Sequence, residues 1–232
     1  MDKKNYNESI FDEYFQKKEK INYSNFTGKM SRRDKKIVKI LTEYGIKNQF
    51  CLDVAPGTGR WLQYFKDNEA KYIAGIDISQ KSIDNFSKIC NKTQKADLEI
   101  DKFDFESNYF DIVISFMTLE HLRDPDLYLS EIIRVLKKNG LLIMSIPNIV
   151  SLISRVRVLL GIMPQAVTND KTHIKFYTKK ELIQLFKPFN QIPKMIPTSF
   201  SLNPFNNSSL RIPSSGLTKS LDDHLLFVVT MK

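Results

Sequence analysis

Residues 50–62 read FCLDVAPGTGRWL, an apolar run that breaks into small and turn-forming residues and then becomes apolar again. This pattern predicts a strand, a tight turn and a helix. Gly57 and Gly59 have no Cβ, so the backbone there can take positive φ and a ligand can lie directly against the peptide groups. The helix that follows presents free N–H groups at its start. The stretch is therefore predicted to be a ligand-binding turn.

Asp53 indicates which ligand this turn accepts. It stands at the end of the predicted strand, where a carboxylate would repel a phosphate and attract a cation. A P-loop is excluded because no Gly-Lys-Ser/Thr follows, and the dinucleotide fingerprint G-x-G-x-x-G fails because Leu62 stands where its third glycine belongs. A turn whose glycines serve backbone geometry alone stays open as the alternative.

Short apolar runs and helical stretches alternate along the chain from residue 50 onward. The runs are Cys51 to Val54, Tyr72 to Ile76, Phe110 to Ser115 and Leu141 to Ile146. This spacing predicts repeated βα units and a parallel sheet, whose ligand crevice lies at the carboxyl ends of the strands.

The residues just after these runs are therefore candidates for ligand contacts. Asp77 stands eighteen residues past Gly59, at the end of the second run, where a carboxylate can accept hydrogen bonds from both hydroxyls of a ribose. Ser79 as the N-cap of the next helix is the alternative role for this turn. A weak third run ends in Asp97 and Leu98, which could offer a carboxylate and an apolar face to a purine. The segment 116–122 should overlook the crevice.

Four segments within residues 48–148 carry a resemblance to a known family: LDVAPGTGRWL, GIDIS, FDIVISFMTLEHL and RVLKKNGLLIMSIPN. The chain resembles the class I S-adenosylmethionine-dependent methyltransferases, in the broad group that includes the ubiquinone and menaquinone biosynthesis enzymes. The resemblance implies a doubly wound, Rossmann-like α/β fold with a mostly parallel seven-stranded sheet, helices on both faces and an antiparallel last strand. It also implies an enzyme that converts S-adenosyl-L-methionine to S-adenosyl-L-homocysteine.

The resemblance assigns ten residues to the cofactor: Asp53, Ala55, Gly57, Thr58, Gly59, Asp77, Ile78, Asp97, Leu98 and Phe116. The glycine loop surrounds the methionine part, and Asp77 holds the ribose hydroxyls. Asp97 meets the adenine amino group, the two apolar residues beside these carboxylates pack on the ring, and Phe116 makes a contact near the sulfonium. Ala55 replaces a glycine usual in the family, and we expect binding to survive because alanine is the smallest change.

The expected chemistry follows from the cofactor. A sulfonium is an activated methyl donor, so the protein must align a nucleophile, exclude water and remove a proton where needed. No metal is required, and the sequence predicts no metal site. His121 is the candidate base because imidazole titrates near neutral pH; the alternative is that Glu120 and His121 only organise their loop. His173, before a predicted helix with a capping box at Thr178 and Glu181, is a second candidate on the substrate side, with a packed or exposed histidine as the alternative.

Composition and length fit one α/β domain. The chain has 232 residues, of which 42% are hydrophobic and 26% charged, which is ordinary for a globular protein. Cys51 and Cys90 show no metal or redox spacing, which favours a reducing compartment. The sequence predicts neither a signal segment nor a membrane span, and therefore a cytoplasmic protein.

The net charge of +9 is unevenly distributed. Residues 1–48 carry 12 Lys/Arg against 7 Asp/Glu, residues 49–147 carry 12 against 15, and residues 148–232 carry 11 against 4. Basic flanks around a mildly acidic middle favour an anionic substrate, a nucleic acid or a membrane surface. A solvated basic surface is the alternative.

The domain is predicted to run from 1 to 232 in four parts. Residues 1–48 form a helical cap, 49–148 the cofactor-binding core, 149–215 a lid with substrate-side insertions, and 216–232 a closing strand. The cap should hold helices over 8–20 and from an N-cap at Ser31 to Gly45. Within the core, a helix starting at Pro125 should end at a Gly140 cap. The tail should place 193–215 in a long loop and 225–231 in an antiparallel strand at the sheet edge.

The apolar insertion 149–163 is predicted first to be a lid over the substrate and second to be an interfacial helix that contacts a lipid surface.

The acceptor is predicted to be a small molecule, acidic or lipid-linked. A nucleic-acid methyltransferase is the alternative that the basic flanks allow, although residues 116–119 (FMTL) lack the Asn/Asp-Pro-Pro-aromatic arrangement of exocyclic base methylation. A cofactor-binding protein without catalysis is a further alternative. The sequence does not indicate an oligomeric state.

Overall fold

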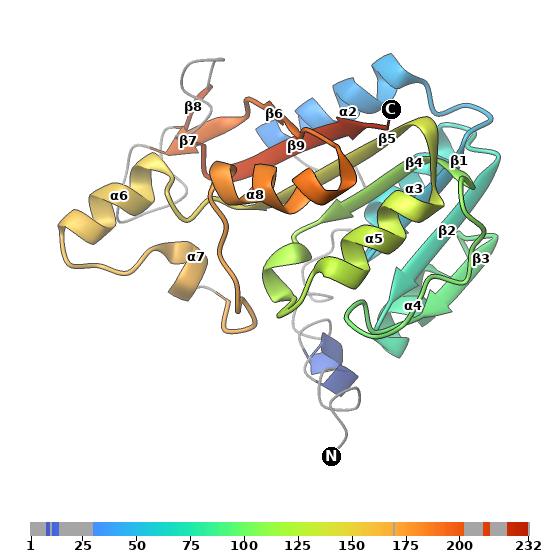
Figure 1. Ribbon diagram of the computed structural model, residues 1–232, viewed down its shortest axis with the longest axis horizontal. Helices are drawn as coiled ribbons and strands as arrows, with labels where there is room; N and C mark the ends of the chain where they lie inside the picture. Colours follow the sequence, from blue (N-terminus) through green and yellow to red (C-terminus); the bar gives the residue numbers. More distant parts are fainter. Residues whose placement is uncertain are drawn as a thin grey trace.

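A computed structural model describes residues 8–9, 11–13, 30–168, 170–201, 211–213 and 222–231. Its centre is a seven-stranded sheet with the strand order β3-β2-β1-β4-β5-β9-β6 (Figure 1). The strands are β1 (Phe50–Val54), β2 (Tyr72–Asp77), β3 (Lys92–Lys95), β4 (Phe110–Phe116), β5 (Leu136–Pro147), β6 (Lys194–Ile196) and β9 (His224–Thr230). The first five strands in chain order pair in parallel, and β9 pairs antiparallel with both β5 and β6. The predicted α/β fold with an antiparallel last strand is confirmed.

Helices cover both faces of this sheet. After residue 30, the helices are α2 (Arg32–Tyr44), α3 (Arg60–Asp67), α4 (Gln80–Phe86), α5 (Asp126–Val135), α6 (Leu152–Leu159), α7 (Gln165–Thr168) and α8 (Lys179–Phe186), with 3-10 turns η1 (Leu119–His121) and η2 (Lys187–Phe189). Of these, α6 and α7 lie beyond the end of the sheet (Figure 1). Apolar side chains of α2, α3 and α4 pack on one face, and those of α5 and α8 pack on the other. Figure 1 shows α5 and α8 in front of the sheet and α2 behind it. The two cores meet only through the sheet, as in a doubly wound fold.

Side-chain caps fix the ends of two helices as the sequence predicts. The Ser31 hydroxyl accepts the Asp34 N–H at 3.0 Å and begins α2, and Gly45 ends it at φ 88°. At α8, Thr178 and Glu181 form a complete capping box. Because each cap satisfies backbone N–H groups that have no partner inside the helix, these residues set where the helices begin.

The predicted Gly140 helix cap is wrong. Helix α5 ends at Val135, and β5 starts directly at Leu136. The register between β4 and β5 shifts after Phe110, and Asn139 takes a φ of 63° at this irregularity. A Cβ on Gly140 would lie 2.8 Å from the Lys137 carbonyl oxygen, so the glycine permits a close backbone approach within a strand bulge.

Two predictions for the tail also need correction. Strand β9 lies between β5 and β6, so the final strand is inside the sheet and β6 forms its edge. The predicted long loop 193–215 contains β6 and a two-stranded antiparallel sheet of β7 (Ser199–Ser201) and β8 (Arg211–Pro213). Of the predicted helix 8–20, residues 8–9 and 11–13 are helical; the remainder lies outside the described residues.

Buried hydroxyl groups hold the carboxyl ends of β1 and β4 together. The Ser115 hydroxyl donates to the Val54 carbonyl at 2.9 Å, and the Tyr128 hydroxyl of α5 donates to Ser115 at 2.7 Å. Burial raises the pKa of Tyr128, so this phenol remains a donor. The network therefore fixes the edge of the sheet where ligand-binding residues are expected. Within the described ranges, no helix combines the length and the apolar character needed to cross a membrane.

Candidate functional site

The glycine loop after β1 has the left-handed backbone that its sequence predicts. Gly57 has a φ of 55° and Gly59 a φ of 75°. A Cβ on Gly59 would lie 2.6 Å from the Cβ of Phe86 in α4, whereas a Cβ on Gly57 would meet no atom of the described residues within 4 Å. Gly59 therefore serves helix packing, while Gly57 leaves open space beside the backbone. Ala55 also takes a positive φ of 60°, in a region that costs an L-residue about 1 kcal/mol or more.

Asp53 is a buried carboxylate at the end of β1. It is 2% exposed, and its Oδ2 has no hydrogen-bond partner among the described residues. Burial raises the pKa of this carboxyl well above its ordinary value; the charge of Asp77 raises it further, and Arg60 opposes the shift. An unpartnered buried acceptor in this setting fits a cationic group of a ligand.

Asp77 lies at the end of β2, as predicted, and its carboxylate is engaged by the chain itself. Oδ1 accepts the Ser79 N–H at 3.0 Å, while Oδ2 accepts the Ser82 hydroxyl at 2.8 Å and the Gly57 N–H at 3.4 Å. Burial raises its pKa, and these hydrogen bonds oppose the shift. Ser79 also caps α4 by accepting the Ser82 N–H at 3.1 Å, so the capping role is present alongside any ligand role. Asp77 thus joins the glycine loop to α4.

The remaining predicted cofactor residues also lie at carboxyl ends of strands. Asp97, 2% exposed after β3, accepts the Glu99 N–H at 3.0 Å. Leu98 is buried and Ile78 half-buried. Thr58 is half-buried within the glycine loop. The ring of Phe116 at the end of β4 packs on Trp61, with centroids 5.3 Å apart. The structure therefore brings the predicted residues to the ends of four adjacent strands.

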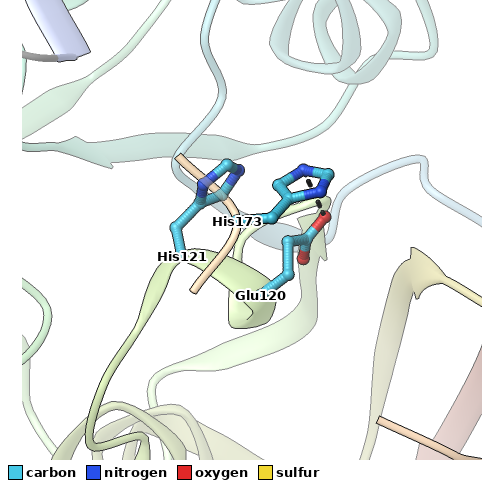
Figure 2. A group of neighbouring side chains, drawn as sticks. All are labelled: Glu120, His121 and His173. Atoms are coloured by element: carbon cyan, nitrogen blue, oxygen red, sulfur yellow. Dashed lines mark ion pairs between the residues drawn. The ribbon is translucent and has the colours of Figure 1, made fainter. Parts of the chain in front are cut away.

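The two predicted catalytic histidines lie next to each other, beside the 3-10 turn η1 that follows β4. The ring centroids of His121 and His173 are 4.9 Å apart, and His173 Nε2 lies 3.9 Å from Oε1 of Glu120 (Figure 2). The Glu120 carbonyl accepts the N–H groups of Ile174 and Lys175 at 2.9 and 3.1 Å. These backbone bonds dock the segment that carries His173 onto η1.

Sequence reasoning missed a charged cluster on α2. The Asp34 carboxylate, in the first turn of α2, lies 2.9 Å from Arg60 at the start of α3 and 3.7 Å from Arg33. Burial lowers the pKa of Arg33, and the charges of Asp34 and Glu120 act in the opposite direction. Nothing local in the sequence indicates this cluster, because α2 and α3 meet only after folding.

A second missed contact comes from the helical residues near the N-terminus. Asp12 accepts the hydroxyl of Ser79, and Glu8 pairs with Lys95 at 2.6 Å. The Phe11 ring meets His121 edge-on, with centroids 5.5 Å apart. These residues therefore lie against the carboxyl ends of β2 and β3 and against η1.

A mostly parallel sheet of this order, with a glycine loop after β1 and an acidic residue at or near the end of each of β1, β2 and β3, matches the class I methyltransferase architecture. A family model described as a methyltransferase domain matches residues 26–190. The chain belongs to this family of methyltransferase domains. No curated protein matches the chain by sequence.

Solved structures with the same fold come from several organisms. A SAM-dependent methyltransferase from Archaeoglobus fulgidus aligns with a TM-score of 0.64 at 19% identity, over 94% of this chain and 99% of that one. A SAM-dependent methyltransferase from Thermotoga maritima, described as a candidate histamine N-methyltransferase, aligns with a TM-score of 0.59 at 18% identity, over 86% of this chain and 95% of that one. A Haloferax volcanii methyltransferase in complex with the Trm112 activator aligns with a TM-score of 0.57 at 15% identity, again over 86% of this chain and 95% of that one. The protein is a class I methyltransferase, and S-adenosylmethionine is its methyl donor.

Proposed function

We propose that the chain transfers the methyl group of S-adenosylmethionine to a small-molecule acceptor, with the acceptor bound beside Glu120, His121 and His173. The meeting of these side chains next to the strand ends carries the proposal, because it places proton-accepting groups beside the expected cofactor site. The net charge of +9 supports an acidic acceptor.

The cofactor residues are proposed from their positions at the strand ends. S-adenosylmethionine supplies an activated methyl group and brings two cations, a sulfonium and an ammonium. Asp53 offers the ammonium a buried carboxylate oxygen that has no hydrogen-bond partner in the described part of the chain, and the open space beside Gly57 admits the ligand to the backbone. Asp77 has acceptor capacity left on Oδ1 for a ribose hydroxyl. Asp97 faces the adenine amino group in this arrangement.

A proton acceptor is needed when the acceptor group is a hydroxyl or a protonated amine. His121 suits this role because a neutral imidazole accepts protons near neutral pH. Tyr177 is also nearby, but burial and the charge of Glu120 raise its pKa to about 12. The phenol therefore stays protonated at neutral pH, and the histidine is the proposed base.

The acceptor class can be tested by supplying S-adenosylmethionine labelled on its methyl group together with cell extracts separated into small-molecule, lipid, RNA and protein fractions. We expect label in the small-molecule or lipid fraction. Label that enters only RNA would overturn the small-molecule proposal and favour a nucleic-acid substrate.

Replacing His121 with alanine should lower turnover by about 100-fold or more, the usual contribution of a positioned base. Calorimetric titration with S-adenosylmethionine controls for folding and should give the same affinity in both proteins. An unchanged turnover rate in the variant would remove His121 as the base.

The end of α6 supports a lipid-linked acceptor. Val158, Leu159, Leu160 and Met163 are all more than half exposed, with Leu159 at 86%. Arg155 and Arg157 lie on the same short helix. Exposed apolar side chains beside arginines are typical of segments that rest on an anionic lipid surface. In Figure 1, α6 follows the carboxyl end of β5, the side of the sheet that also carries the candidate site, so a lid role over the acceptor remains compatible with this proposal.

Sedimentation with anionic vesicles at low salt tests this surface. We expect the wild type to pellet and Leu159→Asp to lose vesicle binding by about tenfold or more, because a buried leucine contributes roughly 1.5–3 kcal/mol. Ile192→Asp is the matched control, since Ile192 is 73% exposed but lies outside α6. A wild type that stays in the supernatant, or equal losses in both variants, would exclude a lipid contact through α6.

A further inference from the structure

Three side chains that can bind a metal meet beside the end of β4. One carboxylate oxygen of Glu120 and one ring nitrogen from each of His121 and His173 all lie within 4.8 Å of one another. Figure 2 shows the Glu120 carboxylate beside the His173 ring, with the His121 ring next to it. Two imidazoles and one carboxylate form a ligand set that binds Zn²⁺ and other divalent transition metals and leaves positions open for substrate.

The hydrogen bonds of both rings place their lone pairs on Nε2. His173 Nδ1 lies 2.7 Å from the Ala166 carbonyl oxygen, which can only accept. His121 Nδ1 lies 3.1 Å from the Thr172 carbonyl oxygen and 3.0 Å from the Thr172 hydroxyl, whose own proton goes to Asp170 at 2.5 Å. The carbonyl oxygen behind each ring therefore accepts the Nδ1 hydrogen, and in a neutral imidazole this places the lone pair on Nε2. Metal-binding histidines usually show this arrangement, with a carbonyl or carboxylate behind the ring.

The surroundings restrain these ligands. Glu120 is 1% exposed, and its carbonyl holds the backbone of the segment that carries His173. The 3.9 Å between His173 Nε2 and Glu120 Oε1 would need to close to about 3.3 Å around a tetrahedral ion with bonds of about 2 Å. Asp170 Oδ2 lies 3.9 Å from the same Nε2 and offers a further carboxylate.

We propose that Glu120, His121 and His173 bind a divalent transition-metal ion of the Zn²⁺ type at the acceptor side of the site. The sequence did not predict it, because His121 and His173 lie far apart in the chain and show no metal-ligand spacing. Only the docking of residues 170–176 onto η1 brings the two rings together.

The role of the ion in the reaction rests on the proposed function; its binding does not. An acceptor hydroxyl bound to the ion would release its proton to water at a lower pH. The oxygen lone pair would then form the bond to the methyl carbon, while the electrons of the breaking S–C bond stay on the sulfur. With the ion bound, His121 Nε2 would be a ligand, and the ion would promote loss of the proton; in the ion-free protein, His121 keeps the role of base proposed above.

Calorimetric titration with ZnCl₂ of protein first stripped with a chelator tests the site directly. We expect one ion per chain, and a loss of affinity greater than about 100-fold in His173→Ala and Glu120→Gln. His224→Ala is the control, because His224 is the third histidine of the chain and lies outside the cluster. Replacing Zn²⁺ with Co²⁺ should give a visible absorption spectrum that His173→Ala abolishes.

Titration with S-adenosylmethionine monitors folding of every variant and is expected to give wild-type affinity. No Zn²⁺ binding by stripped wild type that still binds S-adenosylmethionine would overturn the metal site. Zn²⁺ binding that survives both ligand substitutions would do the same. Neither outcome depends on turnover, so failure of the methyl-acceptor proposal would be recognised separately, by the label experiment.

Discussion

Replacing Asp53 with asparagine is expected to weaken S-adenosylmethionine binding by about 100-fold. The substitution keeps the shape of the side chain and removes the charge that we propose faces the cofactor's ammonium. Loss of one partner from a buried charge pair costs roughly 2–5 kcal/mol, and 100-fold corresponds to about 2.7 kcal/mol. Calorimetric titration measures the loss directly.

The same substitution should change how the stability of the cofactor-free protein depends on pH. Burial and Asp77 raise the pKa of the Asp53 carboxyl in the folded state, so the folded protein holds this proton more tightly than the unfolded chain. The stability that this proton contributes is fully present below the pKa of the Asp53 carboxyl in the unfolded chain. It is lost as the pH rises through the pKa of the same carboxyl in the folded protein. Asp53→Asn should therefore flatten the decline of unfolding free energy with rising pH, so the variant should gain stability relative to the wild type as the pH rises.

Urea unfolding at a series of pH values, without and with S-adenosylmethionine, separates the two effects. Asp104→Asn is a matched control because the Asp104 side chain is 78% exposed, and it should change neither affinity nor the pH profile. Wild-type cofactor affinity in Asp53→Asn would refute the assignment to the ammonium. An unchanged pH profile would show that burial does not perturb this carboxyl.

The sequence predicted the core of the fold because each element there has a local signal. The glycine loop, the alternating runs, Ser31 and the Thr178 capping box all act within a few residues, and the structure confirms them. Gly140 shows the limit of this reasoning, since a glycine after a cationic turn is equally compatible with a helix end and with a strand bulge. Only the pairing of β5 with β4 decides between them.

The candidate site was predictable where it follows strand ends and unpredictable where it depends on packing between distant elements. Asp53 and Asp77 follow apolar runs, so the parallel sheet brings them to one edge. The contact between His121 and His173 depends on backbone bonds from residues 174 and 175 to Glu120, and no periodicity indicates those bonds. The order of the last strands is likewise set by pairing, because β6 precedes β9 in the chain but lies outside it.

Alanine substitutions in the glycine loop are expected to separate folding from ligand binding. In Gly59→Ala, the new Cβ would meet the Cβ of Phe86 at 2.6 Å and the backbone would keep a φ of 75°, so we expect a loss of about 3 kcal/mol in unfolding free energy. In Gly57→Ala, the new Cβ would meet nothing within 4 Å among the residues that the structure describes, so the unfolding free energy should fall by only about 1 kcal/mol from backbone strain. Because its Cβ projects into the space that we assign to the cofactor, its affinity for S-adenosylmethionine should nevertheless fall by about tenfold or more, a cost of roughly 1.4 kcal/mol.

Ala55→Gly is the matched control for these two variants, because it removes a methyl group from the same loop instead of adding one. It relieves a positive φ of 60° and adds no atoms, so stability should rise by up to about 1 kcal/mol after the greater flexibility of glycine in the unfolded chain is subtracted. Cofactor affinity should stay within about twofold, a difference of roughly 0.4 kcal/mol. Thermal unfolding and calorimetric titration of the three variants give both quantities for each. If Gly57→Ala bound the cofactor as tightly as wild type, the open space beside Gly57 would not be the ligand's position, and both glycines would serve the turn alone.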